Sequence, residues 1–232
     1  MIFRQLIDST TFTYTYLVAS RRGGEAVLID PVVEHVPRYL QLIEELGVKL
    51  VYAIDTHVHA DHVTGLGELR ERTECTTIMG AQTKAECVSR RVHDGEIIDV
   101  DGLEIRALHT PGHTDDSYSF VMHDRVFTGD TLLIRGTGRT DFQNGDPYAQ
   151  YDSLFNKLLR LPEETLVYPA HDYKGWTVST IGEEIRYNPR LQVRSADEYA
   201  AIMRALKLPD PMLMDIAVPA NLQCGRRAAR HV

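Results

Sequence analysis

The chain has 232 residues, of which 43% are hydrophobic and 25% are charged, and both fractions are ordinary for a globular protein. Its formal net charge of −8 argues against nucleic acid as the main partner, although a local arginine cluster could still bind an anionic substrate. No apolar run approaches the roughly 20 residues that cross a bilayer, so we expect no membrane association.

The beginning of the chain predicts a hairpin, a helix and a buried strand. Residues 12–18 alternate aromatic or aliphatic side chains with threonine, which is typical of a half-buried strand. The turn RRGGE separates them from a short apolar strand at 26–30, so the two strands predict a hairpin. Pro37 then opens a helix that Gly47 ends, and residues 48–55 predict a buried strand.

The rest of the chain predicts further strands and helices. These are helices at 65–72 and near 81–90, two strands within 96–110, two strands within 117–134, a helix at 147–160 and a strand within 164–173. From Ser179 onward the chain is mostly polar and helical in pattern. This order indicates an α/β protein in which two packed sheets carry helices on the outside.

Ligand-type side chains gather where predicted strands end. They are His57, His59, Asp61, His62, His113, Asp130 and His171. The first four lie within six residues, and packing four such polar groups at one strand end has no structural benefit. Imidazole and carboxylate together suit Zn, Fe or Mn. The sequence therefore predicts a metal site at one rim of the sheets.

Four motifs in a fixed order carry a family resemblance. THVHADH, TPGHT, FTGDTL and YPAHDY resemble the metallo-β-lactamase superfamily over about the first 175 residues. The resemblance implies an αββα sandwich, in which two packed mixed β-sheets are flanked by helices and hold the metal site at one edge. We expect residues 1–232 to form one such domain, with a C-terminal helical extension at 179–232 and a disordered tail at 225–232.

Two further segments, GRTDFQ after Asp130 and AVPAN near the end, resemble a narrower family. These are the ETHE1-like persulfide dioxygenases, and the likeness extends across nearly the whole chain. It implies an oxidoreductase of sulfur metabolism and sulfide detoxification that converts glutathione persulfide, O₂ and water to glutathione and sulfite. It also implies one non-haem Fe(II) per chain, with His57, His113 and Asp130 as its ligands.

The same resemblance gives the other site residues their expected roles. His59, Asp61, His62, His171 and Asp172 become either groups that orient the ligands or an unoccupied second metal site. Arg139 and Arg135 are expected to bind substrate carboxylates, because a guanidinium fork suits a carboxylate. Tyr173 is expected to act in catalysis by donating a hydrogen bond to the substrate. Cys224 is expected either to contact the substrate or to be a buried structural cysteine.

The number of metals is not settled by the ligand inventory. In hydrolases of the superfamily, His57, His59 and His113 would hold one metal, Asp61, His62 and His171 the other, and Asp130 would bridge them. A glyoxalase II-type hydroxyacylglutathione hydrolase with a binuclear site is therefore the main alternative. A non-enzymatic metal or sulfide sensor is a second. The loop after His113 also departs from many relatives, because Asp115 and Asp116 place negative charge near the metal edge.

The cellular compartment and the oligomeric state are predicted only from general patterns of cysteine use, targeting signals and assembly frequency. Cys75, Cys87 and Cys224 are widely spaced and form no CxxC pair, so the sequence predicts no disulfide framework and a reducing compartment. The N-terminal stretch has no basic segment followed by an apolar one, so we expect no secretory signal and a cytoplasmic protein. A homodimer is expected from the frequency of such assemblies.

Overall fold

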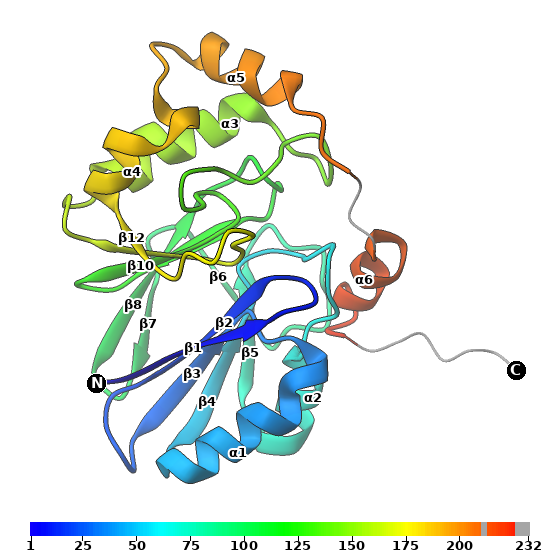
Figure 1. Cartoon of the computed structure of the whole chain (residues 1–232). Helices are drawn as coiled ribbons and strands as arrows, with labels where there is room; N and C mark the ends of the chain where they lie inside the picture. Colours follow the sequence, from blue (N-terminus) through cyan, green and yellow to red (C-terminus); the bar gives the residue numbers. More distant parts are fainter. Residues whose placement is uncertain (210–212, 226–232) are drawn as a thin grey trace, which may run out of the picture.

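The fold consists of two six-stranded sheets that pack face to face, with helices on their outer sides (Figure 1). The computed structural model describes residues 1–209 and 213–225. The first sheet contains, in spatial order, β1 (Ile2–Asp8), β2 (Thr13–Ala19), β3 (Glu25–Ile29), β4 (Lys49–Ile54), β5 (Thr76–Gly80) and β6 (Arg90–Val92). The second contains β12 (Ser179–Thr180), β11 (Leu166–Pro169), β10 (Arg125–Gly129), β9 (Tyr118–Val121), β8 (Leu103–His109) and β7 (Ile97–Val100).

Both sheets are mixed. In the first, β2 and β3 form the predicted antiparallel hairpin, whereas β3 and β4 run parallel because helix α1 (Val36–Leu46) connects them. In the second, β10 pairs antiparallel with β9 and parallel with β11. The predicted αββα sandwich of two packed mixed sheets flanked by helices is confirmed. Strand β1, which pairs antiparallel with β2, is absent from the predicted elements.

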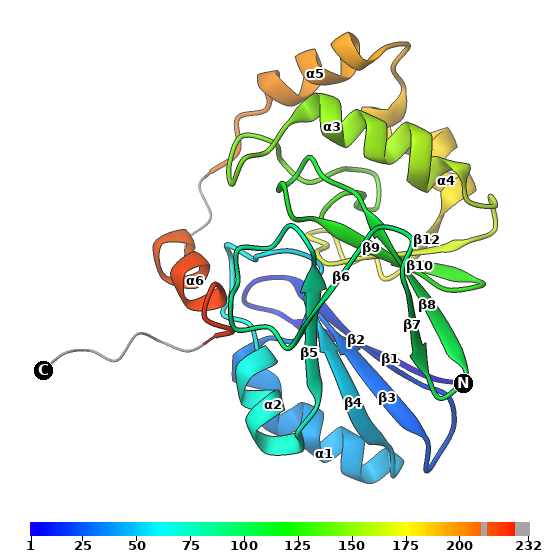
Figure 2. The ribbon, with the colours of Figure 1, turned by 180° about the vertical axis from the view of Figure 1, so that it is seen from behind.

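Three apolar layers hold the sandwich together. The inner layer, between the sheets, contains Tyr16, Val27, Ile54, Phe120 and Phe127 among its buried side chains. A second layer packs α1 and α2 (Leu66–Thr73) on the first sheet, and a third packs α3 (Pro147–Asp152), α4 (Ile181–Tyr187) and α5 (Ala196–Ala205) on the second. Figure 2 shows the same layers from behind. Burial of apolar surface on both faces of each sheet supplies the main driving force for folding.

The helix boundaries largely follow the sequence signals. Helix α1 ends at Gly47, which adopts φ 61° at its C-terminus. Residues 147–160 are helical throughout, but α3 passes into a π-helical turn at Ser153–Lys157 and a 3-10 turn at Leu158–Arg160. Asp146 caps the start of α3 by accepting a hydrogen bond from the backbone N–H of Tyr148.

The predicted helix near residues 81–90 is wrong. The segment is a loop that enters β6, which pairs parallel with β5. Polar side chains explain the difference: the hydroxyl of Thr83 accepts a hydrogen bond from the N–H of Ala85 at 3.2 Å, and that of Thr77 accepts one from the N–H of Ser89 at 3.0 Å. Such local bonds compete with helical hydrogen bonding, and the apolar spacing alone does not reveal them.

The described part of the C-terminal extension is mostly helical. Helices α4 and α5 lie over the second sheet, whereas α6 (Met214–Asn221) lies apart from them, beside the first sheet (Figures 1 and 2). The predicted disordered tail at 225–232 falls, apart from Gly225, outside the described residues. None of the described helices has the length and apolar character needed to cross a membrane.

Asp8 at the end of β1 fixes the turn into β2. Its carboxylate accepts hydrogen bonds from the hydroxyl and N–H of Thr11, at 2.6 and 3.0 Å, and lies 3.1 Å from Nε2 of His35. Burial alone would raise the pKa of Asp8, but these hydrogen bonds outweigh it and lower the pKa from 3.8 to about 2. The carboxylate therefore stabilises the folded state.

We expect Asp8→Asn to lower the free energy of unfolding by about 1–2 kcal/mol at pH 7. The folded pKa of Asp8 lies below its unfolded value, so its stabilisation is fully present above pH 3.8 and is lost as the pH falls through about 2. Urea unfolding of both proteins at pH 7 and pH 2 checks this. A stability difference of the same size at both pH values would contradict it.

Candidate metal centre

Loops after one strand of the first sheet and three strands of the second bring seven ligand-type side chains together. His57, His59, Asp61 and His62 follow β4, His113 follows β8, Asp130 follows β10 and His171 follows β11. The ring centroids of His57 and His113, which come from different sheets, lie 4.9 Å apart. The candidate ligand atoms of His57, His113 and Asp130 lie within 4.8 Å of one another, as do those of His59, Asp61 and His62. The structure thus joins these loops at one rim, as the sequence predicts.

The first group is oriented for metal binding by hydrogen bonds to Nδ1 of each ring. Nδ1 of His57 lies 3.0 Å from the hydroxyl of Thr56, and Nδ1 of His113 lies 2.8 Å from the carbonyl oxygen of Arg139. The nitrogen that would bind a metal is therefore Nε2, and that of His113 lies 3.6 Å from Oδ2 of Asp130. Burial, helped by the nearby rings of His59 and His113, lowers the pKa of His57 well below its ordinary value, which keeps this imidazole neutral.

The second group contains buried nitrogen atoms that have no partner among the described residues. His59 uses Nε2 to bond Asp30 at 3.1 Å, and His62 uses Nδ1 to bond Asp61 at 2.9 Å. The remaining nitrogens, Nδ1 of His59 and Nε2 of His62, are buried and unpaired within the described part of the chain. Unpaired buried nitrogens are unfavourable unless something binds them, so the donor set fits a metal centre.

His171 lies between the two groups and bonds a carboxylate with each nitrogen. Nδ1 is 2.7 Å from Oδ1 of Asp130, and Nε2 is 2.9 Å from Oδ2 of Asp61. Burial disfavours the charged imidazole, but the negative charges of Asp130 and Asp61 raise the pKa of His171 well above its ordinary value. For Asp61 burial by itself would raise the pKa, but the nearby His171 and His62 hold it well below the ordinary value. His171 therefore holds one oxygen of Asp130 and leaves the other facing His113.

Two further residues support this arrangement and were not found from the sequence. Asp30, at the end of β3, accepts a hydrogen bond from the N–H of Thr56 at 2.7 Å and orients His59. Its burial raises the pKa of Asp30 to about 6. Thr13 places its hydroxyl 3.1 Å from Nε2 of His171 and 3.2 Å from Oδ2 of Asp61. Asp30 could have been found in the sequence as an acidic residue at the end of an apolar strand. No sequence pattern marks Thr13.

Tyr173 and Arg139 lie beside the cluster but differ in how they are held. Tyr173 is 62% exposed, and its ring is nearly parallel to that of His171 at 6.0 Å between centroids. Arg139 makes a two-pronged ion pair with Asp141, at 2.7 and 2.8 Å, and donates to the carbonyl of Pro209 at 2.6 Å. A substrate carboxylate would therefore have to compete with Asp141 for this guanidinium.

Arg135 and Asp172 are engaged by other parts of the fold. The guanidinium of Arg135 forms ion pairs with Glu183 and with the fully buried Glu184 of α4. Asp172 accepts hydrogen bonds from the N–H groups of Lys174 and Trp176, at 2.8 and 2.7 Å. Substrate binding by Arg135 would require these ion pairs to break, and Asp172 shapes the turn that follows His171.

Cys224 corrects two expectations drawn from the sequence. It forms a disulfide with Cys87 across 137 residues, so the prediction of no disulfide is wrong, and so is the argument from it for a reducing compartment. Cys224 is also 1% exposed, so its predicted contact with the substrate is wrong and the alternative of a buried structural cysteine fits. The pair was not predicted because cysteine spacing does not reveal a disulfide between distant segments. Cys75 remains a buried free thiol.

Comparisons with known proteins identify the family. The model of the metallo-β-lactamase superfamily matches residues 9–171. The chain is 46% identical to persulfide dioxygenase ETHE1, mitochondrial, from Homo sapiens, over 97% of this chain and 89% of that protein. The crystal structure of ETHE1 from Myxococcus xanthus matches with a TM-score of 0.95 at 54% identity, over 97% of this chain and 100% of that one.

A hydrolase of the superfamily matches less fully. A hydroxyacylglutathione hydrolase from Rhodopseudomonas palustris is 34% identical over 75% of this chain and 68% of that protein. The persulfide dioxygenases share more of the sequence over more of its length, including the C-terminal extension. This chain belongs to the metallo-β-lactamase superfamily and, within it, to the family of ETHE1 persulfide dioxygenases.

Proposed function

We propose that this protein is an iron-dependent persulfide dioxygenase that converts glutathione persulfide, O₂ and water to glutathione and sulfite. The observation that carries the proposal is the 46% identity to a persulfide dioxygenase across 97% of the chain. The cluster of His57, His113 and Asp130 supports it, because two imidazoles and one carboxylate are the ligand set of many non-haem Fe(II) oxygenases.

His57, His113 and Asp130 would hold a single Fe(II). Neutral His57, and His113 oriented by the Arg139 carbonyl, present Nε2, while Asp130 supplies the negative charge. When bound, ferrous iron with three protein ligands supplies open positions where O₂ and a sulfur ligand can bind side by side. His171 fixes Asp130 through its other oxygen, so the carboxylate keeps one orientation.

The substrate would bind on the side of Tyr173 and Arg139. The exposed phenol of Tyr173 can donate a hydrogen bond to the bound persulfide. Arg139 can exchange Asp141 for a glutathione carboxylate, because both are held by the same planar fork. The role of Arg135 in substrate binding stays a prediction, and its ion pairs with Glu183 and Glu184 argue for a structural one.

A binuclear glyoxalase II-type hydrolase is the second candidate function. The unpaired nitrogens of His59 and His62 favour it, because they are donor atoms of the second group. Against it, a second metal held by Asp61, His62 and His171 would have to take one ring nitrogen of His171 and so replace one of its two hydrogen bonds to carboxylates. The single-metal enzyme keeps these bonds.

The test is a metal count and an oxygen measurement on protein purified without air. We expect about one iron per chain, O₂ uptake with fresh glutathione persulfide, and formation of sulfite. Two zinc ions per chain, no O₂ uptake and hydrolysis of a glutathione thioester would instead establish the hydrolase. The mass of the same preparation in solution tests the expected homodimer. A cytoplasmic location also stays a prediction.

A further inference from the structure

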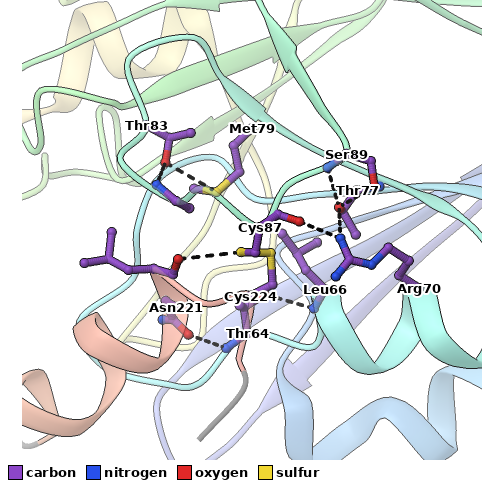
Figure 3. The surroundings of a disulfide bond; sticks show 12 residues. Thr64, Leu66, Arg70, Thr77, Met79, Thr83, Cys87, Ser89, Asn221 and Cys224 are labelled. Atoms are coloured by element: carbon purple, nitrogen blue, oxygen red, sulfur yellow. Dashed lines mark hydrogen bonds between the residues drawn. A yellow bond between two sulfur atoms is a disulfide. The ribbon is translucent and has the colours of Figure 1, made fainter. Parts of the chain in front are cut away.

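Helix α6 ends against the loop that carries the clustered histidines, and Asn221 makes the contact. Its Nδ2 donates hydrogen bonds to the carbonyl oxygens of His59 and His62, at 2.9 and 2.8 Å. Its Oδ1 accepts one from the N–H of Thr64 at 2.8 Å, a contact drawn in Figure 3. Asn221 is 2% exposed, so its amide is removed from water, and these three hydrogen bonds all join it to the same loop.

The two carbonyls that Asn221 binds belong to the two residues with unpaired ring nitrogens. Nδ1 of His59 and Nε2 of His62 have no partner among the residues that the structure describes. A buried amide that fixes both backbones also fixes where both rings can lie. His57 lies in the same loop, two residues before His59, and the centroids of the two rings are 4.1 Å apart.

The end of α6 is tightly docked beside this contact. The disulfide joins Cys224 to Cys87, in the loop between β5 and β6 (Figure 3). The carbonyl of Cys224 accepts a hydrogen bond from the N–H of Gly67 at 2.9 Å. A Cβ at Gly67 would lie 2.5 Å from that carbonyl oxygen, so the two segments approach as closely as glycine allows. Apart from the backbone, the disulfide is the only covalent link within the described residues between the end of α6 and the rest of the fold.

We propose that Asn221 is a positioning residue for the metal centre, and that the Cys87–Cys224 disulfide holds it against the histidine loop. Reduction of the disulfide therefore weakens metal binding. The inference rests on the proposed function in one respect only, the identity of the natural reductant. That reductant is a thiol of the glutathione class, which the proposed dioxygenase reaction releases.

Reduction follows ordinary thiol–disulfide exchange. A thiolate attacks the sulfur of Cys87, which is partly exposed, and the Cys224 sulfur leaves as a thiolate that takes up a proton. A second thiol then displaces the first from Cys87. The disulfide gains two electrons and two protons, and two thiols become one disulfide. Both cysteines then carry thiols, and α6 loses its link to the β5–β6 loop.

The first experiment compares Asn221→Ala with Asn188→Ala. Asn188 is the matched control because it is fully buried and its Nδ2 donates to the carbonyl of Gly136 at 2.9 Å, outside the histidine loop. Co²⁺ is titrated into each metal-free protein, and its visible absorption spectrum is recorded. We expect Asn221→Ala to bind Co²⁺ about 10–100-fold more weakly and with an altered spectrum. Asn188→Ala should lose stability but keep both properties.

The second experiment keeps Asn221 and changes the disulfide. The natural chain is reduced with a phosphine, the phosphine is removed, and Co²⁺ affinity is measured again. After reduction we expect weaker Co²⁺ binding than before it in the natural chain and in Cys75→Ser, which keeps the disulfide. Cys87→Ser cannot form the disulfide, so we expect it to bind Co²⁺ weakly before the phosphine is added and to show no change afterwards. This comparison also decides the matter if Asn221→Ala does not fold.

The outcomes separate this inference from the proposed function. Unchanged Co²⁺ affinity and spectrum in Asn221→Ala would overturn the positioning role, and unchanged affinity after reduction would overturn the role of the disulfide. Co²⁺ binding does not depend on the reaction catalysed. A chain that fails to oxidise glutathione persulfide, yet shows the expected losses of Co²⁺ affinity, would refute the proposed function and support this inference.

Discussion

Replacing Asp130 with asparagine is expected to remove iron from the protein and to lower the rate of sulfite formation by more than about 100-fold. Loss of a group that only orients a metal ligand lowers metal affinity or activity by about 10–100-fold, and loss of a ligand should cost more. Asparagine has nearly the same size but no negative charge. One of its two terminal atoms is an NH₂ group, which cannot bind a metal. Elemental analysis of the anaerobically purified variant and its rate of sulfite formation provide the measurement.

Asp8→Asn is the control for this substitution. It makes the same chemical change at another buried aspartate, whose carboxylate fixes a turn and lies outside the candidate ligand groups. We expect it to lose stability while keeping one iron per chain and an unchanged rate. If Asp130→Asn kept both its iron and its rate, the ligand set of His57, His113 and Asp130 would be wrong. Substitutions in the group of His59, Asp61 and His62 would then be the next to make.

The gathering of the ligand-type residues could be predicted because it depends on strand ends. Each loop follows an apolar run that the sequence marks clearly, and the edge of a packed sheet brings such loops together. His57 and His113 are therefore placed by local patterns, even though they come from different sheets. The family resemblance then supplied the expected metal and the expected reaction.

Contacts between distant segments could not be predicted in the same way. Cys87 and Cys224 pair across 137 residues, and Asn221 reaches back to the carbonyls of His59 and His62. Hydrophobic periodicity reports which face of an element is buried, but not which side chain another segment will meet. Asp30 was missed for the same reason, because its partner His59 lies in a loop 29 residues away.

Arg135 shows that chain proximity to a metal ligand does not determine where a side chain points. Its position just after Asp130 suggested a substrate contact, but its left-handed backbone, with φ 56°, is part of a turn whose N–H donates to Glu184 of α4 at 2.8 Å. The sequence gives the distance along the chain from the metal ligand. It does not give the direction in which the turn sends the side chain.

Replacing Arg135 with alanine is expected to lower the free energy of unfolding by about 3 kcal/mol and to leave the KM for glutathione persulfide unchanged in the folded protein. Glu184 is fully buried, and Arg135 is its charged partner; Ser179 and Asn188 bond it as well, at 2.6 and 2.9 Å. Without the guanidinium, the carboxylate stays buried with no opposite charge beside it. Urea unfolding and steady-state kinetics measure the two quantities.

The double variant Arg135→Ala with Glu184→Gln separates the lost ion pair from lost packing. Glutamine is uncharged and can still bond Ser179 and Asn188, so we expect the double variant to be more stable than Arg135→Ala alone. A normal stability of Arg135→Ala together with a raised KM would reverse this conclusion. Arg135 would then bind the substrate, as its place in the sequence suggests, and its ion pairs with Glu183 and Glu184 would open when the substrate binds.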